Sequence, residues 1–459
     1  MFRKTHARHV RTLAVLLMLF AVPAFVFAGG SKEAAASTAG PKKVNFYLYN
    51  WTLESSMTQL ITAFEKKYPN VNVVYHKMAG ANTHIANLLL SSGAKIDAIP
   101  QASVYDTRLR GQNGIYVNLV PYMKKDGISF KKTFGPGLYS LYSVNGKIYG
   151  IPYGVNSYAV YFNKNMFKKA GVPYPTQDWT WNDLRTAAKA LTTGSGANKV
   201  YGFLPDYINQ WDFPAIEQLG LNYMYRDNGK QANWNNPAFL KSLQFFYNME
   251  MVDKSALPES QFKALKIESD PHAIFLQGKV AMYIAQPFIV KYSSEKSVYG
   301  FKGFNFAAVN LPRVNASDPA KNIFYTSDFS IPVSSTHKQI AWDFLRFFSL
   351  EQPQIYAKAK GMVPAELPAL MGQPMVNRVA NIIFNYPHFS VQSGIQTFFT
   401  NKIMIPALAT LGTASENVQI QTLVQNEVEN TMLGNETPQQ AIANMEQQSN
   451  QIIQRTLNQ

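Results

Sequence analysis

The first folded stretch of the chain alternates between two hydrophobic periods, and this feature constrains the fold more than any other. Residues 44–49 and 71–76 alternate apolar and polar side chains with the period of two that strands have. Residues 57–64 and 85–89 instead repeat apolar side chains at the spacing of one helix face, and residues 95–99 return to a strand pattern. This order of strand, helix, strand, helix, strand is typical of a layered α/β domain with parallel strand pairing.

The same interleaving of strands and helices continues to the end of the chain. Residues 153–162 have a strand pattern, and the spacing of Thr180 and Asp183 predicts a helix that begins with a capping box. Asn236–Pro237 and Thr437–Pro438 predict two more helix starts, because proline is favoured at the first helical position. The folded part of the chain, counted from the first strand onwards, has about 415 residues, too many for one hydrophobic core, so we expect two domains.

Residues 1–28 have the pattern of an export signal. Four basic residues and no acidic residue precede an apolar run, and Val26 and Ala28 stand three residues and one residue before the expected cut. The run is shorter than the roughly 20 apolar residues of a membrane-spanning helix. We therefore expect cleavage after Ala28, a flexible tether over residues 29–43, and a folded body that begins near Val44.

The chain contains no cysteine, and its net charge is strongly positive. Without cysteine it can form no disulfide, no thiolate metal site and no lipid attachment to an N-terminal cysteine, so we expect a free exported protein. The lysine pairs are scattered along the sequence, whereas nucleic-acid binding needs a concentrated basic face. The histidines have no metal-binding spacing. We predict no nucleic-acid partner, no metal and no cofactor.

Three stretches resemble the signatures of one protein family. They are "GKIYGIPY" with "VYFNKNMFKKAGV" and "TWNDLRTAAKALT" over residues 146–192, "FLQGKVAMYIAQPF" over residues 275–288, and "LGNETPQQAIANM" over residues 433–445. They are similar to the extracellular solute-binding proteins of sugar-importing ABC transporters, the family of maltose-binding protein. The resemblance implies a monomeric periplasmic protein that closes on a sugar and delivers it to a membrane permease.

The resemblance also implies an α/β fold of the type II periplasmic binding proteins, in which two lobes with mixed sheets are joined by a hinge. We expect lobe I to comprise residues 44–152 and 310–361, and lobe II to comprise residues 153–309 and 362–459. The three chain crossings would then lie near residues 152, 310 and 362, where backbone torsions absorb the closure.

A sugar site stacks an aromatic ring on the C–H face of the sugar and places amides and acids around the hydroxyls. The candidates for such a site are mostly aromatic residues beside amides or acids at expected strand ends. The candidate ligand-binding residues are Asn50, Trp51, Gln101, Tyr153, Asn156, Tyr158, Trp211, Asp212, Gln286, Phe288, Tyr325 and Asp328. The resemblance places Asn156 where the family often has an acidic sugar ligand and Phe288 where it often has a stacking tryptophan.

Each of these aromatic residues has packing in the core as its alternative role. Trp51 and Trp211 are expected to stack on the ligand because polar residues flank them, whereas Trp179 and Trp181 flank a helix cap and are expected in the core.

Two other functions stay open. The same fold could bind a polyamine, an anion, or ferric iron held by a tyrosine pair such as Tyr223 and Tyr225. A secreted carbohydrate-active enzyme would need paired carboxylates, as in Asp206 with Asp212 or Asp178 with Asp183. Because spacing alone does not make a catalytic pair, we predict no catalytic residue and no enzyme activity.

Overall fold

The computed structural model describes residues 43–458 with ten internal gaps. The gaps are residues 51–53, 80–82, 102–103, 206–209, 221–222, 266–270, 361–362, 365–367, 401 and 407–413. Lys43–Gln459 forms one compact unit. The expected leader, residues 29–42 of the expected tether, and Trp51 lie outside the described residues.

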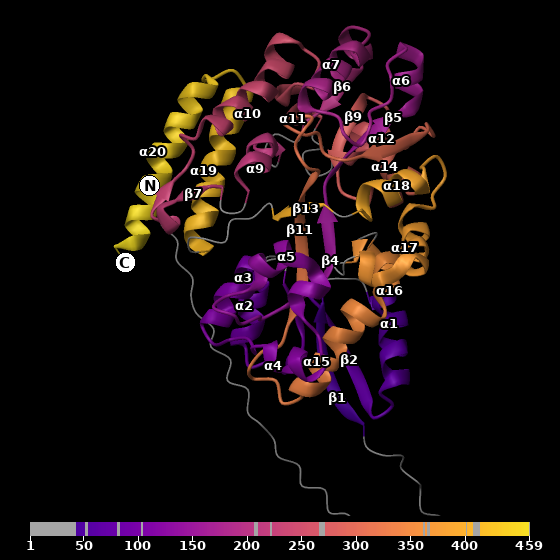
Figure 1. Ribbon diagram of the computed structural model, residues 1–459, viewed down its shortest axis with the longest axis vertical. Helices are drawn as coiled ribbons and strands as arrows, with labels where there is room; N and C mark the ends of the chain where they lie inside the picture. The colour runs from indigo at the N-terminus through magenta and orange to yellow at the C-terminus, as the bar shows by residue number, and fades with distance from the viewer. Residues whose placement is uncertain are drawn as a thin grey trace, which may run out of the picture. The chain divides into compact units, whose positions relative to one another are not determined.

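The strands follow one another in the order that Figure 1 colours from indigo to yellow. They are β1 (Val44–Asn50), β2 (Val71–Lys77), β3 (Ile99–Gln101), β4 (Ile151–Ser157), β5 (Ala159–Asn163), β6 (Tyr201–Leu204), β7 (Tyr225–Arg226), β8 (Gln231–Ala232), β9 (Val280–Ala285), β10 (Phe306–Val309), β11 (Lys321–Ser330), β12 (Val363–Pro364) and β13 (Ile403–Pro406).

The α-helices lie between these strands. They are α1 (Glu54–Lys67), α2 (Thr83–Ser91), α3 (Val104–Gln112), α4 (Val120–Lys125), α5 (Phe130–Tyr142), α6 (Lys164–Ala170), α7 (Trp181–Leu191), α9 (Phe213–Leu219), α10 (Pro237–Tyr247), α11 (Glu259–Ala264), α12 (His272–Leu276), α13 (Ile289–Tyr292), α14 (Lys296–Tyr299), α15 (Lys338–Arg346), α16 (Pro353–Lys360), α17 (Pro368–Phe384), α18 (Val391–Phe398), α19 (Ala414–Met432) and α20 (Pro438–Leu457).

The first five elements confirm the predicted order of strand, helix, strand, helix, strand. Strands β1 and β2 pair in parallel, and a further parallel bridge joins Leu48 to Ala98 just before β3. Strand β3 begins at Ile99, later than the sequence pattern predicts. The preceding Asp97 side chain accepts a hydrogen bond from the backbone N–H of Tyr47, so this stretch is held against β1 before regular pairing starts.

The chain passes from one of the two larger sheets to the other at Tyr158. Strands β12, β4, β11 and β13 form one sheet in that order, with β3 also paired to β11, and β10, β5, β9 and β6 form the other. The sequence predicts one strand over residues 153–162, but the structure divides it into β4 and β5. The N–H of Tyr158 donates to the carbonyl of Ile323 in β11, while the next residue, Ala159, already pairs with Ala285 in β9.

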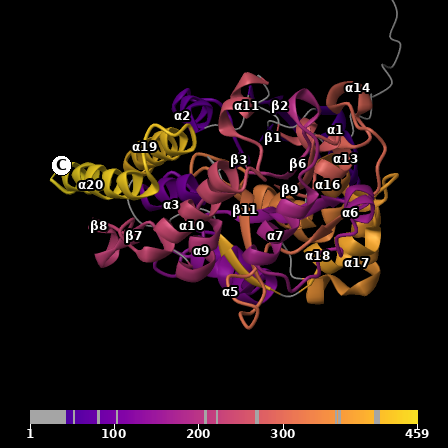
Figure 2. The same cartoon turned by 90° about the horizontal axis from the view of Figure 1, so that it is seen from above.

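The predicted capping box of α7 is confirmed, and the predicted helix start at Thr437–Pro438 is confirmed and has a capping box of its own. The Asp183 N–H donates to the Thr180 hydroxyl over 3.2 Å, and the Thr180 N–H donates to the Asp183 carboxylate over 2.8 Å, at the start of α7. Thr437 and Gln440 exchange the same two bonds at the start of α20. Helices α19 and α20 lie side by side in both views of the chain (Figures 1 and 2), and the Asn444 amide joins them by donating to Glu427.

Trp179 and Trp181 are buried in a hydrophobic core, as the sequence predicts. This core contains residues between 158 and 311 together with residues of β11, β13, α19 and α20. A separate core contains residues between 46 and 155 together with β11 and α15. The residue boundaries of the two lobes stay a prediction.

Candidate functional site

Polar and aromatic residues from four parts of the sequence meet where the chain passes from one larger sheet to the other. We call them the junction cluster. Its members are Asn156 of β4, Tyr158 between β4 and β5, Asp212 and Phe213 at the start of α9, Tyr223 before β7, and Tyr325 of β11. Four of these six residues, Asn156, Tyr158, Asp212 and Tyr325, are candidates from the sequence.

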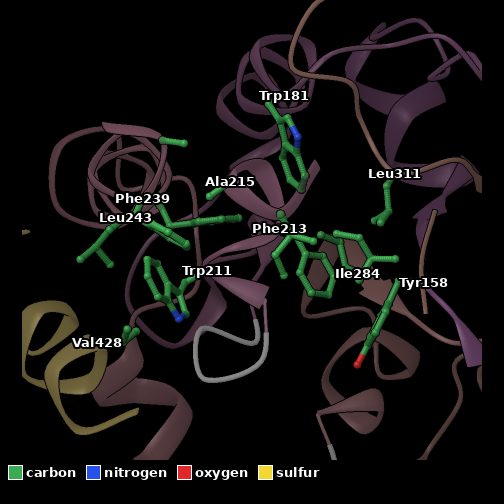
Figure 3. Packing of buried hydrophobic residues seen from close by; sticks show 14 of the residues in the cluster. Tyr158, Trp181, Trp211, Phe213, Ala215, Phe239, Leu243, Ile284, Leu311 and Val428 are labelled. Carbon is green, nitrogen blue, oxygen red and sulfur yellow. The ribbon is translucent and has the colours of Figure 1, made fainter. Parts of the chain in front are cut away.

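Tyr158 is the aromatic centre of the junction cluster. Its ring meets the Phe213 ring edge to face at 4.9 Å between centroids, and it meets the Tyr325 ring in the same way at 5.9 Å. Figure 3 shows Phe213 beside Tyr158. Tyr325 pairs directly with Asn156 across the antiparallel ladder of β4 and β11, so these two side chains lie on the same face of the sheet.

The Asp212 carboxyl and the Tyr223 hydroxyl form the polar part of the junction cluster. Burial raises the pKa of Asp212 to about 7, and a hydrogen bond from the Tyr223 hydroxyl acts against that rise. Burial also raises the pKa of Tyr223 well above its ordinary value, and the nearby Asp212 and Tyr325 act in the same direction. Near neutral pH, Tyr223 is therefore a neutral donor, and Asp212 can offer an acceptor or a proton to a bound hydroxyl.

Two amide oxygens near these groups have no hydrogen-bond partner among the described residues. They are the buried Asn156 Oδ1 and the buried Gln210 Oε1, while the Gln210 amide nitrogen donates to the Ile284 carbonyl over 3.0 Å. Buried polar atoms are nearly always paired in native proteins. These oxygens therefore have unused capacity to accept hydrogen bonds, which water or the hydroxyl of a solute could fill.

Trp211 lies in the hydrophobic core and not on an open face. Its side chain is 2% exposed, and its ring packs against Trp234 at 6.1 Å and Phe239 at 6.0 Å. Figure 3 shows it beside Phe239 of α10 and near Val428 of α19. This placement favours the packing alternative over the expected stacking on a ligand, because both neighbours cover apolar ring surface that a sugar would need.

Gln101, Tyr153 and Asp328 lie apart from the junction cluster in a buried polar and aromatic region. Gln101 pairs with Asp328 across β3 and β11, and its side-chain oxygen accepts from Arg110. The Asp328 carboxylate accepts from Thr107 over 2.9 Å and from Tyr142 over 3.0 Å. Burial raises the pKa of Asp328 to about 7.

Tyr153 packs its ring against Phe329 at 5.2 Å and Phe348 at 5.0 Å in the core of β1, β4 and β11. The structure thus gives this candidate a packing role beside the polar pair of Gln101 and Asp328.

The remaining candidates lie at two further places. Asn50 is fully buried at the end of β1, where its carbonyl accepts from the Met78 N–H over 2.8 Å. Gln286 and Phe288 follow β9, and the Phe288 ring meets the rings of His272 and Tyr292 at 5.2 Å each. The structure therefore does not place these three residues in the junction cluster.

Phe213 and Tyr223 are the two members of the junction cluster that are absent from the candidates for a sugar site. Phe213 has a polar neighbour on one side only, and Tyr223 lies eleven positions after Asp212, beyond the end of α9 at Leu219. The sequence pattern names Tyr223 only as half of a possible iron-binding pair, and it gives no signal for Phe213, because the contacts that matter are made between distant segments.

The alternative functions find limited support in the described residues. No group of three or more histidine, aspartate or glutamate side chains there could hold a metal. Ferric iron prefers tyrosinate oxygen, whereas the hydroxyl of Tyr223 is held neutral by burial and donates to Asp212. Of the carboxylate pairs, Asp183 caps α7 and Asp178 pairs with Arg313 at 2.5 Å, while Asp206 lies outside the described residues.

The chain matches known proteins over most of its length. Residues 50–355 match the family described as bacterial extracellular solute-binding protein. An arabinooligosaccharide-binding protein of Bacillus subtilis is 27% identical over 249 residues, which cover 53% of this chain and 54% of that protein. The sn-glycerol-3-phosphate-binding periplasmic protein of Escherichia coli is 24% identical over 345 residues, which cover 72% of this chain and 74% of that protein.

A solved structure supports the fold. A sugar transporter protein of Rhizobium etli, in an open conformation, superposes with a TM-score of 0.74 at 23% identity and covers 89% of this chain and 98% of its own. This likeness confirms the predicted two-lobed α/β fold. Among the described residues, no helix has the length and apolar character to cross a bilayer. Since the family match extends over more than half of the sequence, this chain belongs to the bacterial extracellular solute-binding protein family.

Proposed function

We propose that this protein is the solute-binding component of an ABC importer and that its solute is a sugar, either an oligosaccharide or a glycoside. The family match over residues 50–355 is the observation that carries this proposal. The protein binds the sugar by closure of two lobes and delivers it to a membrane permease, with the junction cluster forming part of the site.

The chemistry of the junction cluster suits a neutral, hydroxyl-rich solute. Tyr158, Tyr325 and Phe213 offer aromatic surface, and Asn156, Asp212 and Tyr223 offer donors and acceptors. A phosphate-containing solute, such as the one named for the Escherichia coli relative, is the second candidate. The junction cluster has a carboxyl group and no cationic side chain, so it favours a neutral sugar over a phosphate.

The finer features of the proposal come from the sequence. The protein is a monomer without enzyme activity, has no nucleic-acid partner, and is free in the periplasm after cleavage behind Ala28. Mass spectrometry of the exported protein should give a first residue at or near Gly29 and no acyl group. A retained leader or an attached lipid would contradict this part of the proposal without affecting the ligand class.

A thermal-shift screen of the purified protein tests the ligand class. The panel contains arabino-oligosaccharides, malto-oligosaccharides, monosaccharides, sn-glycerol 3-phosphate, spermidine and ferric citrate. A ligand that binds only the folded state raises the melting temperature, and 100 times the Kd of ligand adds about 2.7 kcal/mol to the free energy of unfolding. A shift with a sugar, confirmed by calorimetric titration without product release, supports the proposal. A shift only with a phosphate, polyamine or iron compound overturns it.

A further inference from the structure

Four exposed lysines flank the turn between α4 and α5. They are Lys124, Lys125, Lys131 and Lys132, and we call them the α4–α5 lysine patch. The Lys131 ammonium lies 6.0 Å from the Tyr139 ring, and Lys125 donates to the Gln339 side chain over 3.4 Å. Among the described residues, none of the four belongs to an ion pair within 4 Å.

The carboxylates nearest to this patch have other partners. Asp126 accepts from the Trp342 indole N–H over 2.7 Å and pairs with Arg346 at 3.2 Å. Asp343 lies 3.8 Å from Arg346 and accepts from Gln339 over 3.2 Å. Burial raises the pKa of Asp343, and Lys125 is a smaller influence in the opposite direction than Gln339 and Arg346. Helices α4 and α15, which carry these groups, lie close together in Figure 1. Positive charge therefore remains in excess on this surface.

Lys131 and Lys132 do not favour the start of α5, whereas Lys124 and Lys125 stand in the last turn of α4, where basic side chains stabilise a helix. Lys131 and Lys132 stand in the first turn of α5, which has no acidic residue, although acidic side chains are the ones that stabilise a helix start. Neighbouring ammonium groups also repel one another. The contact of Lys131 with the Tyr139 ring offsets this cost only in part. Local rules that are broken in this way are expected at functional surfaces.

We propose that the α4–α5 lysine patch binds the phosphate headgroups of an anionic bilayer. Clusters of four to eight basic residues are attracted to anionic membrane surfaces. Protein interfaces, in contrast, are enriched in aromatic residues and arginine and depleted in lysine, and the four members of this patch are all lysines. The attraction holds the protein at a membrane surface by a contact separate from solute capture.

Vesicle co-sedimentation tests the proposal with the mature chain. The vesicles are pure phosphatidylcholine, or phosphatidylcholine with about one quarter phosphatidylglycerol, at low salt and at about 0.5 M salt, where screening is strong. The patch variant replaces Lys124, Lys125, Lys131 and Lys132 by glutamine. The control variant removes the same charge from other exposed positions by replacing Lys168, Lys169, Lys296 and Lys302 by glutamine.

The wild type and the control should bind the phosphatidylglycerol vesicles at low salt and be released at high salt. The patch variant should bind these vesicles at least about tenfold more weakly than the wild type. Equal loss of vesicle binding in both variants would overturn the proposal, because it would show that binding depends on the net charge of the protein and not on this patch. Failure of the wild type to bind would refute the lipid partner. An acidic protein surface would then be the remaining candidate partner of the patch. Equal binding to pure phosphatidylcholine would also refute it.

Thermal melts of both variants show whether they fold. If the fourfold patch variant melts early, the two pairs Lys124→Gln with Lys125→Gln and Lys131→Gln with Lys132→Gln are tested separately. Each pair should then weaken binding to phosphatidylglycerol vesicles by a smaller factor, and unchanged binding in both would overturn the proposal.

Discussion

Tyr158 and Tyr325 meet edge to face, with their ring centroids 5.9 Å apart, where the chain leaves the sheet of β4 for the sheet of β5. Tyr158 also contacts Phe213 at the start of α9, so three separate segments converge on one ring. Any rotation of one sheet against the other would move these rings. The junction cluster is therefore the part of the described structure in which ligand contact and lobe movement are expected to be coupled.

Replacing Tyr325 by alanine should weaken sugar binding by tenfold or more. The ring offers apolar and edge contacts, aromatic pairs contribute about 0.5 to 1.5 kcal/mol beyond burial, and about 1.4 kcal/mol is tenfold in affinity. Calorimetric titration measures the loss. Tyr174→Ala is the matched control, because Tyr174 is 44% exposed and lies outside the junction cluster. Equal affinity of both variants would remove Tyr325 from the site.

Trp211→Ala should lower the free energy of unfolding by about 3 to 5 kcal/mol, because it leaves a cavity between Trp234 and Phe239. Urea unfolding measures this change, and titration of the folded fraction measures affinity. Unchanged stability with lost affinity would restore the stacking role that the sequence suggests. Trp51→Ala is expected to do the reverse, with weaker binding and nearly unchanged stability.

Asp328→Asn should remove a dependence of stability on pH. Burial raises the pKa of Asp328 from 3.8 to about 7 in the folded protein, so folding favours its protonated form. The stabilisation that this proton provides is complete below about pH 4 and is lost as pH rises to about 7. One pKa unit corresponds to about 1.4 kcal/mol. The wild type should therefore lose stability relative to the variant, by up to about 4 kcal/mol across this window.

The quantity to measure is the difference in the free energy of unfolding between the wild type and Asp328→Asn at each pH. Burial lowers the pKa of His272 to about 4, which gives both proteins an opposite slope between about pH 4 and 6.5. Urea unfolding at several pH values separates the two effects. The exposed Asp227→Asn is the control and should run parallel to the wild type. A parallel profile for Asp328→Asn would mean that the carboxyl is ionised throughout.

Saturating sugar should reduce the radius of gyration in small-angle scattering. A ligand that contacts both lobes stabilises the closed form by its difference in affinity for the two forms. The rotation is expected about the segments near residues 152, 310 and 362. An unchanged scattering curve with binding shown by calorimetry would exclude lobe closure as the mode of capture.

Much of the local structure could be predicted from the sequence. Signals within a few residues predict the capping box of α7 and the start of α20. They also predict the parallel pairing of β1 and β2 and the buried positions of Trp179 and Trp181. The candidate site could be predicted only in part. Asn156, Tyr158, Asp212 and Tyr325 come together as sequence candidates. Tyr223 joins them through a hydrogen bond to Asp212 that the sequence pattern does not predict.

The sequence by itself determined the order of strands and helices, the helix starts and the family, because periodicity, caps and motifs depend on neighbouring residues. Only the tertiary structure decided that the chain changes sheets at Tyr158 and that Trp211 packs into the core. Both outcomes depend on partners far away in the chain. Ile323 takes the N–H of Tyr158, and Trp234 and Phe239 cover the Trp211 ring, so the flanking residues of each position could not reveal its surroundings.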